Sequence, residues 1–137
     1  MTLKERIMQH EGLRLKPYRC TAGKLTIGYG RNLDDVGISK EEAELMLDND
    51  LSICNQECFA AFDWYSEMDQ VRRGVILEMC FNLGLPRLKG FKKMLLACEH
   101  KNYSVAADEM LSSRWAGQVG QRAKTLADIM RKGVENV

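Results

Sequence analysis

The 137-residue sequence predicts an α+β, mostly helical fold with a small N-terminal hairpin lobe and a helical C-terminal lobe joined by a long helix. Two observations predict it. Residues 14–30 read as two short strands punctuated by glycine, as in a β-hairpin. After Ser39, apolar residues recur at helical spacing, and no linker is long enough to separate domains. We therefore expect a single domain over residues 1–137, with lobes at about 12–38 and 60–137.

The first expected helix ends at Gly12. Leu3, Ile7 and Met8 give it an apolar face, and glycine commonly ends helices in the left-handed conformation. Glu11 would then lie at the helix C-terminus, where the macrodipole disfavours negative charge. This position favours the protonated carboxyl that a general acid uses. It equally suits an ordinary surface residue at a fraying helix end.

A hairpin is expected next. Residues 14–18 alternate in polarity, and Pro17 is tolerable on an edge strand. Residues 20–23 favour a turn, and residues 24–27 resume as a β-branched strand. Gly28-Tyr29-Gly30 closes that strand with two residues able to adopt positive φ.

Helices are expected over the rest of the chain. Ser39 and Glu42 predict a capping box before a run to about Phe59. Asp69 predicts the cap of a buried helix that ends near Gly84, and Pro86 marks a break. Three further runs are expected at 88–98, 104–111 and 120–132.

The hairpin and two later segments together resemble a known family. The matching residues are Glu11-Gly12-Leu13, Tyr18, Thr26-Ile27-Gly28-Tyr29-Gly30, Ser113-Arg114-Trp115, Gln118 and Arg122. In this ordered set the sequence resembles the phage-type lysozymes, or endolysins, of glycoside hydrolase family 24. The resemblance runs from about residue 3 to the C-terminal end.

The resemblance implies that Glu11, Cys20 and Thr26 are catalytic. Glu11 falls on the family's catalytic acid and Thr26 on a threonine near the attacking water. Cys20 falls where the best-known member has an aspartate, and cysteine is a known alternative there. An ordinary thiol is mostly neutral at pH 7, unlike an aspartate, although the basic neighbours Arg19 and Lys24 would favour a thiolate. Alternatively, Cys20 is only a turn residue and Thr26 only a strand residue.

The resemblance also implies that Asn32, Phe81 and Asn82 bind substrate. Asn82 would hydrogen-bond sugar hydroxyl or acetamido groups, or alternatively cap the C-terminus of its helix. Arg122 falls where the family has an arginine able to pair with the catalytic acid. We expect Trp115 to be a core residue rather than a sugar platform, because an aromatic residue within a helical lobe is more often core.

The function implied is that of an endolysin, a muramidase that hydrolyses the β-1,4 bond between N-acetylmuramic acid and N-acetylglucosamine in peptidoglycan. A lytic transglycosylase and an inactive peptidoglycan-binding module are the alternatives. We expect a monomer with no cofactor that acts on glycan strands and depends on a holin for release from the host cytoplasm to the periplasm. The N-terminal sequence MTLKERIMQHE has no long apolar run, so neither a signal peptide nor stable membrane association is expected.

Charge and cysteine patterns support this interpretation. The net charge is +1, but residues 1–32 are basic, residues 33–69 are acidic apart from Lys40, and the C-terminal part is basic again. Basic surfaces attract an anionic polymer such as the cell wall, and no nucleic-acid motif appears. The five cysteines form no CxxC pair or zinc-ligand spacing, so no metal is expected. Cys54, Cys58, Cys80 and Cys98 are expected to be reduced core residues.

Overall fold

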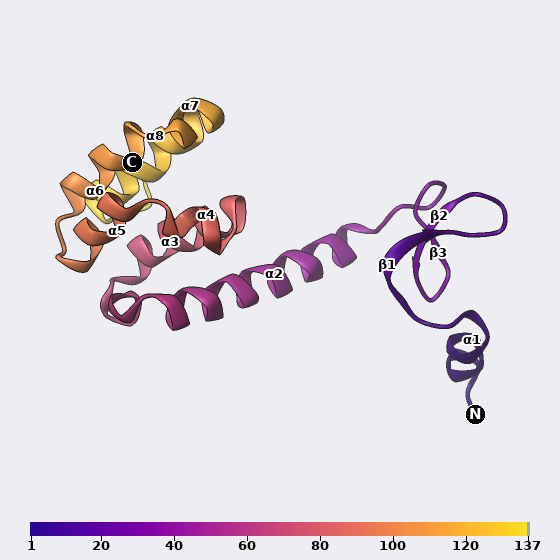
Figure 1. Ribbon diagram of the computed structural model, residues 1–137. Coiled ribbons are helices and arrows are strands. Elements are labelled where there is room, and N and C mark those ends of the chain that lie inside the picture. Colours follow the sequence, from indigo (N-terminus) through magenta and orange to yellow (C-terminus); the bar gives the residue numbers. More distant parts are fainter. Residues whose placement is uncertain (137) are drawn as a thin grey trace. The chain divides into compact units, whose positions relative to one another are not determined.

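The computed structural model describes residues 1–136, which form two compact units. The first unit is Met1–Met46 and the second begins at Leu47, so the division falls within helix α2 (Lys40–Ala61) (Figure 1). The structure is mostly helical, with one three-stranded antiparallel sheet, which confirms the expected fold class. The organisation as one domain stays a prediction.

Helix α1 (Leu3–Glu11) opens the N-terminal unit. Its capping box is local: the Thr2 hydroxyl accepts from the Glu5 N–H at 3.1 Å, and the Glu5 carboxylate accepts from the Thr2 N–H at 3.0 Å. The helix ends at Gly12 as expected, but with φ 73° and ψ 157°, outside the left-handed helical region. The reason is that the chain passes from this residue into a strand and does not turn back over the helix end.

The sheet has the order β1 (Arg14–Arg19), β2 (Leu25–Gly28), β3 (Arg31–Asn32). The expected hairpin is confirmed, with a turn closed by the Gly23 N–H donating to the Cys20 carbonyl at 2.8 Å. Pro17 lies on the edge strand β1, where a missing N–H donor costs least. Strand β3 was not expected, because two residues are too short for an alternating pattern.

The start of α2 is fixed to the sheet of the N-terminal unit. The expected Ser39–Glu42 capping box is present, with hydrogen bonds of 2.9 and 3.1 Å. Glu42 also pairs with Arg31 of β3 at 2.7 Å. The Arg31 hydrogen bond, followed by that of the Ser39 N–H, lowers the pKa of Glu42 to about 2. These contacts join the last strand to the first turn of the helix.

The C-terminal unit is helical after α2. Its elements are η1 (Asp63–Glu67), α3 (Gln70–Leu83), α4 (Leu85–Lys89), α5 (Lys92–Glu99), α6 (Tyr103–Leu111), α7 (Arg114–Val119) and α8 (Gln121–Lys132). The predicted Asp69 cap is confirmed, since its side chain accepts from the Arg72 N–H at 3.0 Å. Elements η1 and α7 were not expected, because each is too short to show a helical period.

The single helix expected at residues 88–98 was wrong. A break does lie beside Pro86, at Gly84 between α3 and α4, and Pro86 itself lies in the first turn of α4, where proline is tolerated. A second break, which was not expected, falls at Gly90 and Phe91, and Phe91 has non-helical ψ of 58°. There the Phe91 ring turns toward Trp115, with ring centroids 6.1 Å apart in an edge-to-face contact.

The core of this unit lies among α3, α5, α6 and α8. Cys58, Cys80 and Cys98 are buried as expected, whereas Cys54 is only partly buried against this core. Trp115 is 3% exposed, which confirms its core position. Arg72 closes the end of α8 by donating to the carbonyls of Met130 and Arg131. In the described part of the chain, no helix combines the length and the apolar content that a bilayer crossing requires.

Candidate active site

Glu11 lies at the last position of α1, and its carboxylate lies against Gly30 in the β2–β3 turn. A Cβ atom built on Gly30 would be 2.7 Å from Glu11 Oε2, so only glycine leaves room for the carboxylate in this position. Gly30 also has φ of +85°, which other residues rarely adopt. The backbone of this turn therefore lies directly against the carboxylate of Glu11, the predicted catalytic acid.

Cys20 and Thr26 lie together at the closed end of the β1–β2 hairpin. The pKa of Cys20 is lowered, first by a hydrogen bond from the Lys24 backbone and then by one from the Ala22 backbone. The Thr26 hydroxyl contributes a weaker lowering. That hydroxyl also donates to the Lys24 carbonyl at 2.9 Å, so its one hydrogen serves one partner at a time. The backbone N–H groups therefore dominate the stabilisation of a thiolate.

Thr26 and Asn32 face each other across β2 and β3. They are paired residues of the antiparallel register, and Thr26 is 4% exposed. The Asn32 amide donates to Asp35 at 3.0 Å, and its oxygen accepts from the Asp35 N–H at 3.0 Å. Glu11, Cys20, Thr26 and Asn32 thus all belong to the N-terminal unit: Glu11 is on α1, Thr26 and Asn32 are on β2 and β3, and Cys20 directly follows β1.

The other predicted substrate-binding residues, Phe81 and Asn82, lie near the end of α3 in the C-terminal unit. Asn82 Oδ1 accepts from Trp115 Nε1 at 2.8 Å, which satisfies the buried indole N–H. Gly84, not Asn82, is the C-cap of α3. The Asn82 side-chain amide nitrogen remains available to a ligand, because the contact to Trp115 uses only the oxygen.

Arg122, for which the resemblance implies a pairing with the acid, forms an ion pair within the C-terminal unit. Its Nε donates to Glu78 Oε2 at 2.9 Å, which joins α8 to α3. This contact was not foreseen from the sequence, because the two residues are far apart along the chain.

A comparison with family models identifies the phage lysozyme model, which matches residues 8–133. The chain belongs to the phage lysozyme family. The family consists of glycoside hydrolases, so the chain is an enzyme of that class. It is 31% identical to an endolysin of Acyrthosiphon pisum secondary endosymbiont phage 1, over 94% of this chain and 88% of that protein. It is also 26% identical to a probable T4-type lysozyme 1 of Dictyostelium discoideum, over 98% of this chain and 96% of that protein.

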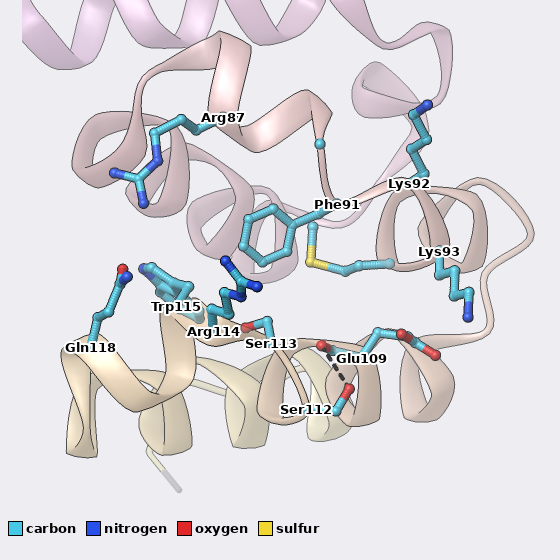
Figure 2. A pocket seen from close by; sticks show the side chains of 12 residues that line it. Arg87, Phe91, Lys92, Lys93, Glu109, Ser112, Ser113, Arg114, Trp115 and Gln118 are labelled. Atoms are coloured by element: carbon cyan, nitrogen blue, oxygen red, sulfur yellow. Dashed lines mark hydrogen bonds between the residues drawn. The ribbon is translucent and has the colours of Figure 1, made fainter.

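This phage lysozyme family member also has a hollow of about 660 Å³ in its C-terminal unit. Figure 2 shows its wall, with Phe91 beside Trp115 and four basic side chains around them. The basic residues are Arg87, Lys92, Lys93 and Arg114. Glu109 is the one acidic residue of the described lining. The sequence showed the basic character of this region but not the hollow, because α4, α5, α6 and α7 all contribute to it.

Proposed function

We propose that this protein is an endolysin, a muramidase that cleaves the β-1,4 bond between N-acetylmuramic acid and N-acetylglucosamine in peptidoglycan for host-cell lysis. The observation that carries the proposal is the close approach of the Glu11 carboxylate to Gly30. A side chain held in this way keeps a fixed orientation, which proton donation to a glycosidic oxygen requires. Family membership supports the same reaction class.

In the proposed mechanism, Glu11 donates its proton to the leaving oxygen as the bond to the anomeric carbon breaks. A water molecule held by the Thr26 hydroxyl attacks the same carbon from the opposite face. Cys20, whose pKa is lowered mainly by the Lys24 backbone, accepts a proton from that water as a thiolate. Attack from the opposite face inverts the configuration, and Asn32, Phe81 and Asn82 bind the flanking sugars.

The basic hollow around Phe91 and Trp115 is the second part of the proposal. Its four cations with a single opposing carboxylate favour an anionic ligand, and the peptide stems of peptidoglycan carry carboxylates.

The enzyme acts as a monomer without a cofactor. Its release from the host cytoplasm to the cell wall depends on a holin.

Mass spectrometry of digested cell wall tests the reaction class. A muramidase adds water and leaves a reducing N-acetylmuramic acid end, which we expect from the wild-type protein. A lytic transglycosylase uses the muramic acid's own hydroxyl group and leaves an anhydro end, and products of that kind would contradict hydrolysis. Binding to wall fragments without any cleavage would instead identify an inactive binding module.

A further inference from the structure

A second cluster of reactive side chains lies in the C-terminal unit, outside the residues proposed for catalysis. Cys54 and Glu57 come from α2, and Cys80 comes from α3. One ligand atom from each, two sulfurs and a carboxylate oxygen, lie within 4.8 Å of one another. We propose that Cys54, Glu57 and Cys80 bind a thiophilic divalent cation, with Zn²⁺ as the best-suited ion. This inference is independent of the proposed function.

The geometry follows from helix periodicity. Asp50, Cys54 and Glu57 are four and three residues apart, so they lie on one face of α2. In a tetrahedral zinc site, Zn–S bonds of about 2.3 Å and Zn–O bonds of about 2.1 Å place ligand atoms about 3.5–3.8 Å apart. The observed limit of 4.8 Å therefore calls for a contraction of at most about 1.3 Å, which side-chain torsions allow.

The cluster opens into a cavity that has room for an ion with its remaining ligands. This cavity has a volume of about 240 Å³, and its lining includes Asp50, Phe81 and Gly84 beside the three ligands. A water molecule occupies about 30 Å³ in the liquid, so water fits as the fourth ligand. Asp50 offers a carboxylate for the same position. All of these residues belong to the C-terminal unit.

Within residues 1–136, the carboxylates of the cluster lack a cationic partner and its thiols are not oxidised. Neither Asp50 nor Glu57 forms an ion pair there, and Cys54, Cys58 and Cys80 are all free thiols. A bound cation would supply the missing positive charge. Two thiolates select Zn²⁺ or a similar soft ion over Mg²⁺ and Ca²⁺, which prefer oxygen ligands.

Cys58 supports the site from the interior. It is fully buried, and its thiol hydrogen-bonds with that of Cys80. Partners of this kind orient a metal ligand without binding the ion. Simple core packing would explain buried cysteines, but it gives no reason for a carboxylate within reach of two of their sulfurs.

Cobalt titration of the reduced, metal-free, full-length protein tests the proposal. We expect one Co²⁺ per chain, a thiolate-to-cobalt charge-transfer band, loss of that band on adding Zn²⁺, and a higher melting temperature with Zn²⁺. Cys54→Ala and Glu57→Gln should each weaken binding about tenfold or more. Cys98→Ala is the matched control, because it removes a buried thiol of α5 that lies outside the cluster.

Two outcomes would overturn the proposal. One is wild-type protein without the charge-transfer band, or variants Cys54→Ala and Glu57→Gln that bind cobalt as the wild type does. The other is a disulfide, Cys54–Cys80 or Cys58–Cys80, found by peptide mapping of the protein as purified. This outcome counts against the site if the same protein, once reduced, binds no cobalt. Because Glu57→Gln leaves the thiols in place, it keeps the test decisive even where Cys54→Ala folds poorly.

Discussion

Gly30 is the residue whose contact with Glu11 most directly positions the proposed acid. Gly30→Ala would place a methyl group 2.7 Å from Glu11 Oε2 and push the carboxylate away. Gly28→Ala is the matched control, because Gly28 has a similar φ of +71° but nothing within 4 Å of the added Cβ. Both changes should cost about 1–2 kcal/mol of stability through backbone strain.

Only the first change should affect turnover strongly. We expect cell-wall hydrolysis by Gly30→Ala to fall about 100-fold, since small displacements of a catalytic group cost about that much. Gly28→Ala should stay within a few-fold of the wild type. The measurement is the initial rate of turbidity loss at a temperature where both variants are folded. Equal rates for the two alanine variants would show that the Gly30 contact has no catalytic role.

Cys20 differs from the other cysteines of the chain in its ionisation. Backbone hydrogen bonds, that of Lys24 first, lower its pKa, whereas burial raises the pKa of Cys54, Cys58 and Cys80 to about 11. Iodoacetamide at neutral pH should therefore modify Cys20 first and stop turnover. Cys20→Asp should remain active while Cys20→Ala falls well below it. Full activity of Cys20→Ala would make this residue a turn residue only.

At the residue scale, the sequence indicated the identities of the candidate groups better than their surroundings. Glu11 and Thr26 were found from local spacing and the family resemblance. The Glu11–Gly30 contact was not, because residues distant in sequence meet only when the sheet forms. The asparagine at position 82 shows the same limit: its partner Trp115 lies on another helix.

At the element scale, the ion pair between β3 and α2 gives a pH-dependent stability. The folded-state pKa of Glu42 is about 2, below its ordinary value of 4.5, so ionised Glu42 stabilises the fold. This contribution is fully present above about pH 4.5 and is lost as the pH falls through about 2. Glu42→Gln should therefore be less stable than the wild type at pH 7.

The stability difference between wild type and Glu42→Gln should shrink between about pH 4.5 and pH 2. Denaturant unfolding at several pH values measures it. Glu41→Gln is the control, because this neighbouring carboxylate lies on the same helical turn and forms no ion pair among the described residues. A difference that persisted unchanged at pH 2 would contradict the assigned role of the Arg31–Glu42 pair.

Elements with strong local signals were predictable and short elements were not. Asp69 and the Ser39–Glu42 box marked helix starts correctly, because capping depends on residues three apart. The two-residue strand β3 and the six-residue helix α7 give no period to detect. The break at Gly90 was missed because the packing of Phe91 on Trp115 is a tertiary contact.

At the scale of the whole molecule, the core positions expected for Cys58, Cys80, Cys98 and Trp115 are confirmed. Cys54 and Cys80 were assigned to packing alone, because the proposed ligand set is divided between α2 and α3 and has no sequence motif. The basic hollow likewise required the fold, since four helices supply its lining. Patterns within one element are visible in sequence, whereas sites formed by several elements depend on the tertiary structure.

The central claim is that Glu11 is the proton donor in peptidoglycan hydrolysis. The most direct test compares wild type, Glu11→Gln and the control Glu41→Gln in turbidity assays on permeabilised Gram-negative cells. Because general acid catalysis contributes about 10²–10⁴-fold, Glu11→Gln should lose at least 99% of the activity while it folds normally. Glu41→Gln should keep wild-type activity. A Glu11→Gln variant that retained more than about a tenth of the wild-type rate would contradict the proposed role of Glu11.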